Sequence, residues 1–309
     1  MLSRTADHLY WMARYTERAE NMARLLEVTY RMSLLPQSGE RGYWGAALGI
    51  TGLDQTYAER HSSIVAHDVL DFMVLDTDNP SSIMSSLRLA RENAHAVRGT
   101  LTSETWETIN TTWLNARDMA TRQLQGSELV GFFDWVKYRS HLSRGVVVGT
   151  MLQDEAFHFI RLGTFLERGD NTARILDVKF DALAPDTAPE ADYYEWGALL
   201  RSVSAFEIYR KVYRDVITPN RVAELLILRR EMPRSLLACM SEVVDILNLV
   251  ANTRSDETER LAGELHARLR FGRMTEILAR GLHEFLTEFL DRTAEVGHRI
   301  SEDFLVAAI

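Results

Sequence analysis

The sequence predicts an almost wholly α-helical, soluble protein built from two copies of one helical unit. Three observations support this fold class. The 309 residues include only 6 Pro and 17 Gly, and so few helix breakers favour long helices over many short strands. Apolar residues recur at spacings of three and four, and no segment keeps the alternation of a strand. Two stretches of chain, about 150 residues apart, resemble each other in order.

The helical spacing is clearest near the N-terminus. The apolar positions there that would share one core-facing side are Leu9, Met12, Ala13, Ala19, Met22, Ala23 and Leu26. Ser3 or Thr5 is expected to cap this helix, and Pro36 with Gly39 to end it. Further helices are predicted over 63–75, 81–99, 103–124, 130–147, 150–182, 192–214, 219–230, 233–251, 255–271 and 273–304. Residues 184–192 are predicted to form a loop, and the run from Asp78 to Ser82 a turn with a helix cap.

The internal similarity has three parts. Residues 15–28 match 165–178, with Glu-Arg, Asn, Ala-Arg, Leu and Val identical in the two segments. A Trp-Gly-Ala run with a later Leu and Tyr matches in 44–57 and 196–209. Residues 73–82 match 226–235, and both segments end on a Pro-x-Ser sequence. Three matches in the same order with a nearly constant offset predict a tandem duplication.

The duplication also predicts how the chain is organised. We expect a helical bundle that forms a single compact domain over residues 1–309, with repeat halves of approximately 1–149 and 150–309. A duplicated unit buries its apolar side most easily against its own copy around a pseudo-twofold axis. No linker rich in Pro, Gly or Ser lies near residue 150, which favours one body.

The matched segments carry a polar side on each predicted helix. At about 100° per residue, Glu167, Asp170, Asn171 and Arg174 share one side, and Leu162, Leu166, Ala173 and Leu176 share the opposite one. The first copy repeats this pattern. The first polar stripe comprises Glu17, Arg18, Glu20, Asn21 and Arg24, and the second comprises Glu167, Arg168, Asp170, Asn171 and Arg174.

Three interpretations of the stripes follow from their residue types. They can be solvated, salt-bridged helix surfaces, or a buried network that fixes how the helices pack. They can also line a cleft that binds a zwitterion, carboxylate or phosphate, with Arg as a fork-shaped donor. We take the ten residues as candidate substrate-binding residues and expect the stripes to face each other across the axis. No catalytic residue is identifiable.

A carboxylate-based, metal-dependent enzyme is an alternative. Two Glu-x-x-His pairs, Glu92/His95 and Glu155/His158, have the spacing that di-iron helical proteins use. Glu167 lies about 18 Å beyond Glu155 on the same predicted helix, so these two carboxylates cannot share a metal. Glu17 or Glu20 could complete such a site, but we assign no metal ligand and expect no cofactor. A structural interaction protein without catalysis is the third possibility.

Composition and motifs argue against several classes of protein. The net charge of -9 argues against a general affinity for nucleic acid. The single cysteine, Cys239, excludes a disulfide framework and is expected to be buried. The longest nearly apolar stretch, 145–152, is far shorter than the roughly 20 residues that span a bilayer, and no signal-peptide core is visible. We therefore expect a cytoplasmic protein with no nucleic-acid and no membrane partner. No nucleotide-binding or hydrolase motif occurs.

The ordered motifs resemble the bacterial alpha-E family, whose name refers to an α-helical fold and a Glu-Arg motif. The segments that carry the resemblance are residues 1–6, 10–11, 14–15, 17–21, 75–83, 90–94, 165–168, 172–178, 200–207, 233–235 and 281–284. The resemblance covers nearly the whole chain. It departs where Gly169 and Asp170 replace the Ala19 and Glu20 of the first copy.

The resemblance implies a functional context. Members of this family are typically encoded beside, or fused to, circularly permuted ATP-grasp proteins, often with a transglutaminase-like peptidase. The resemblance therefore implies an accessory or substrate-handling component of an ATP-grasp-dependent system that forms peptide or amide bonds. An ATP-grasp protein, and in some systems the peptidase, would be the partners.

Overall fold

The computed structural model describes residues 1–34, 40–122, 124–182 and 189–305. Every regular element in these ranges is a helix, and none of them is a strand. The predicted all-α fold class is therefore confirmed. The repeated spacing of apolar residues explains this, because a helix with one apolar stripe is stable once the stripe is buried against neighbouring helices.

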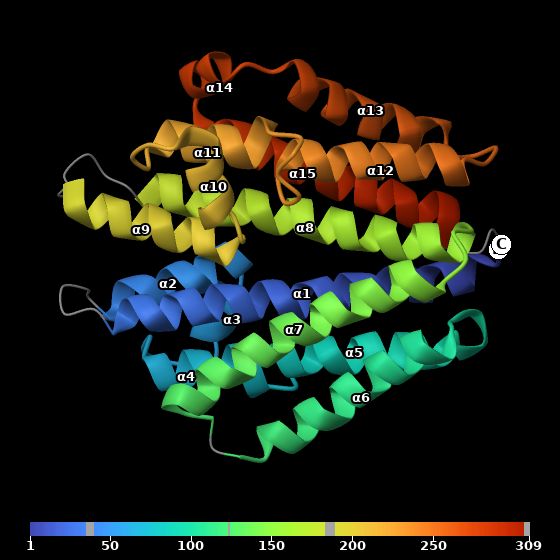
Figure 1. Ribbon diagram of the computed structural model, residues 1–309, viewed down its shortest axis with the longest axis horizontal. Coiled ribbons are helices and arrows are strands. Elements are labelled where there is room, and N and C mark those ends of the chain that lie inside the picture. The colour runs from blue at the N-terminus through green and yellow to red at the C-terminus, as the bar shows by residue number, and fades with distance from the viewer. Residues whose placement is uncertain (35–39, 123, 183–188, 306–309) are drawn as a thin grey trace.

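One group of helices packs around α1 (Ser3–Ser33). It contains α5 (Ile83–Ala96) and α7 (Gly126–Thr150), which both contact α1, and α6 (Ser103–Ala120), which lies against α5 and α7. All seven apolar residues that were predicted to face the core of α1 are buried. This group forms the lower half of the molecule in Figure 1.

A second group packs around α8 (Glu155–Ala182). It contains α12 (Leu236–Val250) and α15 (Leu282–Ile300), which contact α8, and α13 (Asp256–Phe271), which lies against α12 and α15. Cys239 on α12 is fully buried, as predicted, and burial raises the pKa of its thiol to about 12.

Shorter elements connect the long helices. The α-helical ones are α2 (Glu40–Thr51), α3 (Asp54–Ala58), α4 (Ala66–Leu70), α9 (Pro189–Ser202), α10 (Phe206–Tyr213), α11 (Pro219–Leu228) and α14 (Met274–Arg280). Two π-helical turns, η1 (Asp71–Leu75) and η3 (Ser301–Leu305), and one 3-10 turn, η2 (Arg98–Thr100), complete the described elements. Helix α2 packs on both α1 and α8.

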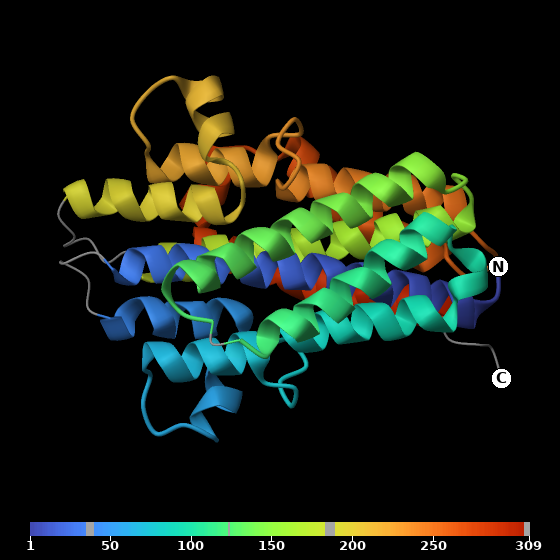
Figure 2. The ribbon, with the colours of Figure 1, turned by 60° about the horizontal axis from the view of Figure 1, so that its bottom comes forward.

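The two groups meet along α1 and α8, which run side by side in the same direction (Figures 1 and 2). Their backbones lie very close together at Gly163, where an added Cβ would be 2.3 Å from the carbonyl oxygen of Tyr10. Only glycine permits this approach. We call the α1–α8 contact the seam. One continuous hydrophobic cluster includes residues of both groups.

Several helix boundaries confirm the sequence analysis. Ser82 caps α5, and its hydroxyl accepts a hydrogen bond from the amide of Ser85 at 3.0 Å. Asn79 lies in the predicted turn before that cap. The predicted helices over 63–75, 103–124 and 255–271 are each present with modest shifts at their ends.

Other boundaries were wrong. The segment 192–214 is two helices because Ser204, at φ 56°, breaks it, and 273–304 is interrupted by Gly281, at φ 110°. Helices α2 and α3 were not predicted at all. Neither Ser3 nor Thr5 caps α1 through its side chain, since Leu2 occupies the cap position. Pro36 and Gly39 lie outside the described residues.

Two further expectations about loops need correction. Helix α9 begins at Pro189, so the predicted loop 184–192 ends earlier than expected, and the rest of that stretch lies outside the described residues. The helix predicted over 233–251 begins later than expected. Ser235 is the cap of α12, and its hydroxyl accepts a hydrogen bond from the amide of Ala238. Arg234 is therefore outside the helix, and its side chain extends into the protein.

In the described part of the chain, no helix is both long enough and apolar enough to cross a membrane.

The close approach at the seam generates a prediction. Gly163→Ala should destabilise the protein by about 1–3 kcal/mol, because α1 and α8 must move apart to admit the new methyl group. The free energy of unfolding in urea measures this loss. Gly145→Ala on α7 is the control, since an added Cβ there meets nothing within 4 Å. It should stabilise α7 slightly, by up to about 1 kcal/mol. Equal effects of the two substitutions would contradict the tight contact.

Candidate functional site

The two Glu-Arg dipeptides of the repeated segments pair with each other across the seam. Arg168 donates from Nε and Nη2 to the carboxylate of Glu17, at 2.9 and 3.0 Å. Arg18 donates from Nε and Nη2 to the carboxylate of Glu167, at 2.6 and 3.1 Å. Each arginine thus grips the glutamate of the other helix with two hydrogen bonds, the strongest geometry for this type of pair.

These carboxylates are removed from solvent. Glu17 is 1% exposed and Glu167 is 6% exposed. Burial alone would raise the pKa of Glu167, but the charges and hydrogen bonds of Arg14 and Arg18 outweigh it and lower the pKa to about 2. Arg168 and Arg234 likewise lower the pKa of Glu17 against the effect of burial. Both groups therefore stay ionised at neutral pH and depend on their arginines.

The first polar stripe is completed by arginines from outside α1. Glu20, which is fully buried, accepts from Arg24 on its own helix, from Arg144 on α7 and from Arg234. Ser140 also donates to it at 2.8 Å. We call this set the closed network; its members are Glu17, Glu20, Asn21, Arg24, Ser140, Arg144, Arg168 and Arg234.

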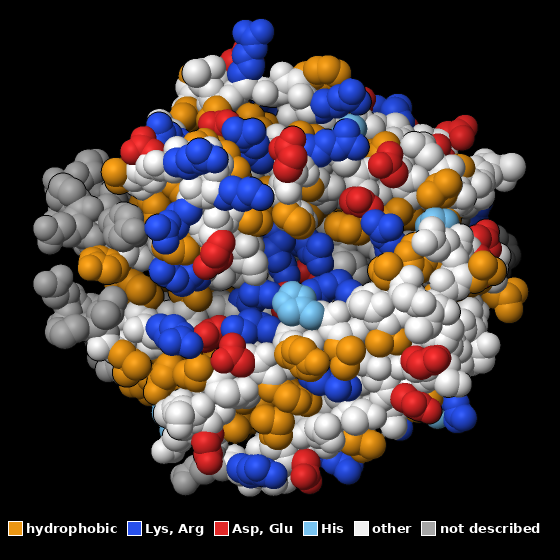
Figure 3. All heavy atoms as spheres, in the orientation of Figure 1, with side chains coloured by type: hydrophobic (Ala, Val, Ile, Leu, Met, Phe, Trp, Pro, Cys, Tyr) orange, Lys and Arg blue, Asp and Glu red, His pale blue; other side chains and the backbone are white. Residues whose placement is uncertain are grey.

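Arg234 is the central cation of the closed network. Its guanidinium donates to Glu17 at 3.0 Å, to the Oδ1 atom of Asn21 at 2.9 Å and to Glu20. Only 7% of its side chain is exposed. Figure 3 shows Lys and Arg side chains gathered around a hollow near the middle of one face, with a histidine beside them. The donors and acceptors of this network bond mainly to one another.

The second polar stripe has fewer internal partners. Glu167 accepts from Arg14, at 2.7 Å, as well as from Arg18. Asp170 is paired with Arg174, one turn along α8, through bonds of 2.8 and 3.2 Å. The Arg174 and Asp170 side chains are 41% and 25% exposed, so this pair is in contact with solvent.

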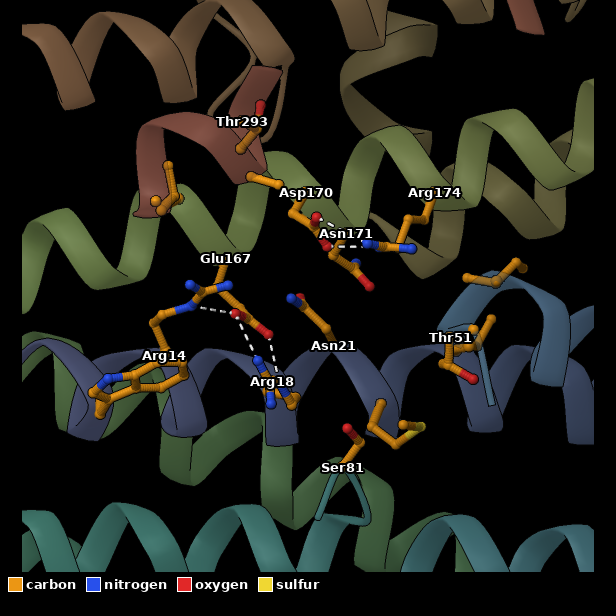
Figure 4. A pocket seen from close by; sticks show the side chains of 18 of the residues that line it. Arg14, Arg18, Asn21, Thr51, Ser81, Glu167, Asp170, Asn171, Arg174 and Thr293 are labelled. Atoms are coloured by element: carbon orange, nitrogen blue, oxygen red, sulfur yellow. Dashed lines mark hydrogen bonds and ion pairs between the residues drawn. The ribbon is translucent and has the colours of Figure 1, made fainter. Parts of the chain in front are cut away.

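A cavity of about 670 Å³ lies over this second stripe; we call it the seam cavity. Figure 4 shows the cluster of Arg14, Arg18 and Glu167 towards one end of it and Arg174 with Thr51 towards the other. Asn21 extends from α1 into the space between them. Other lining residues come from α2, α15, η3 and the turn before α5, and include Ile50, Gly52, Ser81, Thr293, Gly297, His298 and Ser301.

Two buried polar groups at the seam cavity lack partners. The Nδ2 atom of Asn21 has no hydrogen-bond partner although the residue is only 4% exposed. The hydroxyl of Thr293, on α15, also has none, and that residue is 3% exposed. An unpaired buried polar group costs about 1–3 kcal/mol, so such groups in a cavity wall favour a ligand that supplies the missing bonds.

The charges around the seam cavity are unequal. Three arginines, Arg14, Arg18 and Arg174, line it together with only two carboxylates, those of Glu167 and Asp170. Tyr10 and Glu167 accept bonds from Arg14, and Glu167 from Arg18. Since a guanidinium has five N–H donors, these acceptors leave further N–H groups to interact with a ligand. The cavity is therefore suited to an anionic group that is held by several donors.

The structure separates the ten candidate residues. Those that line the seam cavity are Arg18, Asn21, Glu167, Asp170, Asn171 and Arg174. Glu17 and Arg168 instead border a smaller, more apolar cavity of about 350 Å³ against α7. Glu20 and Arg24 line neither cavity. The seam cavity is thus lined by residues of both stripes, but it does not extend over Glu17, Glu20 and Arg24, because the closed network occupies the space beside them. The pairing between stripes was confirmed for the two Glu-Arg dipeptides.

Sequence reasoning missed three arginines that decide this arrangement: Arg14, Arg144 and Arg234. Arg14 is one helical turn before Arg18, so helical spacing could have placed it beside the stripe. Arg234 stands before the cap of α12, in a segment that matches 73–82. Arg144 carried no signal of its own, because it reaches Glu17 and Glu20 only through the packing of α7 on α1.

The metal interpretation finds no ligand set. Among the described residues, no group of three or more His, Cys, Asp or Glu side chains is placed to hold a metal ion. The four stripe carboxylates are all paired with arginines. Glu155 pairs with the N-terminal amine and Glu92 with Arg88, while His95 packs on the ring of Trp106. The two Glu-x-x-His pairs are therefore engaged elsewhere.

The seam and its Glu-Arg pairs can be compared with known families. A family model described as a predicted α-helical domain with a conserved ER motif, the Alpha-E family, matches residues 1–305. This chain belongs to the Alpha-E family. In this member, the two Glu-Arg dipeptides of the repeated segments form the paired contacts across the seam.

Curated relatives are longer proteins. The chain is 28% identical to uncharacterized proteins from two strains of Mycobacterium tuberculosis and from Mycobacterium bovis, over 93% of its own length. The match covers only 35% of each relative, so the chain spans about a third of their length. No solved structure matches this chain significantly.

The burial of Glu167 generates a stability prediction. Glu167→Ala should destabilise the protein by roughly 3 kcal/mol or more, because it leaves Arg14 and Arg18 without their shared partner in a poorly solvated place. Asp170→Ala, which breaks a partly exposed pair on the same helix, should cost less than about 1 kcal/mol. Urea unfolding measures both. Similar losses would mean that the Glu167 pairs are effectively solvated.

The lowered pKa values also generate a pH prediction. A carboxyl whose pKa is lower in the folded state stabilises the protein above its ordinary pKa, which is 4.5 for Glu167, and this contribution is lost as pH falls towards about 2. We expect the free energy of unfolding to fall steeply between these pH values. The drop should be shallower in Glu167→Gln, which cannot titrate. A wild-type protein with the same shallow profile as this variant would contradict the assignment.

Proposed function

We propose that this Alpha-E chain is a substrate-handling component of an ATP-grasp-dependent system that forms peptide or amide bonds. The seam cavity binds an amino-acid-like or peptide-like substrate through its carboxylate. One observation carries this proposal: an open cavity at the seam where arginine donors outnumber carboxylates and Asn21 offers an unpaired Nδ2 atom.

The size and lining of the cavity support a small organic ligand. Its volume of about 670 Å³ lies within the range of roughly 300–1,000 Å³ that is usual for such sites. Arg14 and Arg18 are held rigidly by Glu167, so they would not lose much freedom on binding a carboxylate. Asn171, Thr51 and Ser81 add polar groups that can bind a peptide-like amide.

The titration of the buried glutamates supports a binding role over independent acid–base catalysis. An efficient general acid or base has a pKa near the working pH. The arginines hold the pKa of Glu167 at about 2 and lower those of Glu17 and Glu20. These groups would neither take up nor release a proton readily near neutrality. The activating chemistry is then assigned to a partner that binds nucleotide.

We also propose that the groups around α1 and α8 are copies of one unit related by a pseudo-twofold axis. Reciprocal Glu-Arg pairs across parallel helices support this, as does the shared cap arrangement of Ser82 and Ser235. In this arrangement one copy holds the closed network and the other holds the seam cavity.

The length of the mycobacterial relatives is compatible with a multi-part system. About two thirds of each relative lies outside the matched region. We propose that an ATP-grasp protein, and in some systems a transglutaminase-like peptidase, acts together with this chain on a common substrate.

Ligand binding tests the proposal for the cavity. A panel of L-amino acids and dipeptides should include members that raise the melting temperature, whereas the matching C-terminal amides, which lack the carboxylate, should not. Arg18→Met should weaken binding by about tenfold, which corresponds to 1.4 kcal/mol for one lost charged hydrogen bond to the carboxylate. Arg31→Met is the control, because Arg31 is also on α1 and paired with a glutamate, Glu27, but lies away from the cavity. Amides that bind as well as acids would refute the carboxylate assignment.

Association tests the proposal for the partner. The tagged protein should co-purify with the product of a neighbouring ATP-grasp gene, or change its ATP turnover with an amino acid of the panel. If the two proteins neither associate nor affect each other's activity, the assignment to an ATP-grasp system is wrong. Binding in the seam cavity would then be judged by the ligand experiment alone.

A further inference from the structure

The seam cavity takes the place, beside the second stripe, that two arginines of the closed network take beside the first stripe. The matched segments 73–82 and 226–235 put Ser81 opposite Arg234, each directly before a serine that caps a long helix. Arg234 extends into the first stripe and bonds to Glu17, Glu20 and Asn21. Ser81 lines the cavity over the second stripe but cannot reach across it. The position of one guanidinium is therefore open.

The second arginine, Arg144 on α7, also has a small counterpart at the seam cavity. Helices α7 and α15 share one pattern of burial: Leu129, Phe132, Phe133, Val136, Ser140, Ser143 and Val147 correspond to Leu282, Phe285, Leu286, Phe289, Thr293, Val296 and Ile300. In this register Gly297 stands opposite Arg144. Gly297 lines the seam cavity, whereas Arg144 bonds to Glu17 and Glu20.

Without these two arginines, polar groups beside the second stripe have fewer hydrogen-bond partners than their counterparts beside the first. Glu20 accepts bonds from three arginines and from Ser140. Its counterpart Asp170 has one arginine, Arg174. The hydroxyl of Thr293, the counterpart of Ser140, has no partner. A carboxylate has about four lone-pair positions, so Asp170 can accept further donors from the cavity.

We propose that the ligand of the seam cavity carries a guanidinium group, which occupies the place that Arg234 fills in the closed network. The guanidinium donates to Asp170 and to the Oδ1 atom of Asn171, as Arg234 donates to Glu20 and Asn21. The ligand's carboxylate faces Arg14, Arg18 and the Nδ2 atom of Asn21. The ligand class is a basic amino acid or short peptide with an arginine-like side chain. This inference rests on the proposed function, because it specifies the substrate of the same site.

The arginine counts show what the seam cavity lacks. The closed network contains Arg24, Arg144, Arg168 and Arg234 against two glutamates. The seam cavity has three arginines against two carboxylates, one cation fewer. A guanidinium in the ligand supplies that cation beside Asp170, and the ligand's carboxylate meets the excess of arginine donors at Arg14 and Arg18. A planar fork suits a carboxylate and an amide oxygen better than the point charge of an ammonium group.

Calorimetric titration with L-arginine and L-citrulline tests the inference. Citrulline has nearly the same shape but a neutral urea in place of the guanidinium, so it should bind at least about tenfold more weakly. Asp170→Asn should weaken the binding of L-arginine by a similar factor and remove most of the preference for L-arginine over L-citrulline. Asp170 pairs at a partly exposed position, so this variant should fold. Equal affinity for the two ligands would overturn the proposal that the ligand carries a guanidinium, but not the proposed carboxylate site.

A second variant fills the cavity from within the chain. Ser81→Arg supplies a side chain at the position that matches Arg234 and should abolish binding of L-arginine. Ser127→Arg is the matched control, because it adds the same charge at an exposed position of α7 away from the cavity. Undiminished binding to a folded Ser81→Arg protein would overturn the proposed position of the guanidinium.

L-Argininamide distinguishes the two levels of the proposal, since it keeps the guanidinium and lacks the carboxylate. If it binds as tightly as L-arginine, the carboxylate assignment of the proposed function fails while the guanidinium site stands. If L-arginine does not bind at millimolar concentration but other amino acids do, the guanidinium inference fails alone. If no amino acid or dipeptide binds, both assignments fail.

Discussion

The structure depends on buried arginine–glutamate pairs at the contact between α1 and α8. A carboxylate as buried as that of Glu17 or Glu167 would be costly without a cation, and each finds its arginine on the opposite helix. These pairs fix the register of two long parallel helices, because a shift of one residue along either helix would separate both pairs. Gly163 allows the backbones to come close enough for the pairs to form. The polar contact therefore determines how the two apolar groups of helices meet.

The same contact has different consequences on its two sides. Beside the first stripe, Arg144 and Arg234 reach in from other helices and complete a network whose buried donors and acceptors largely satisfy one another. Beside the second stripe, the chain has Ser81 and Gly297, and a cavity remains. A protein that needed only structural ion pairs would gain nothing from unpaired groups at Asn21 and Thr293. The difference between the sides separates a structural role for the closed network from a binding role for the seam cavity.

Much of the fold follows from local sequence. Helical spacing identified α1 and α8, and the serine before α5 identified its cap, because both depend on neighbouring residues. The Glu-Arg pairing was foreseen since identical polar residues recurred on the same side of both helices. The cavity could not be foreseen, because it results from side chains that are short at Ser81 and absent at Gly297. Breaks at Ser204 and Gly281 were missed because apolar spacing continues through them.

A double-mutant cycle on Glu17 and Arg168 tests the central claim most directly. The free energy of unfolding would be measured for the wild type, Glu17→Gln, Arg168→Met and the double variant. A pair that fixes the seam should show a coupling energy of about 2 kcal/mol or more, against less than about 0.5 kcal/mol for the exposed pair of Glu257 and Arg260. A coupling at Glu17 and Arg168 no larger than that of the exposed pair would show that the seam is held by apolar packing alone.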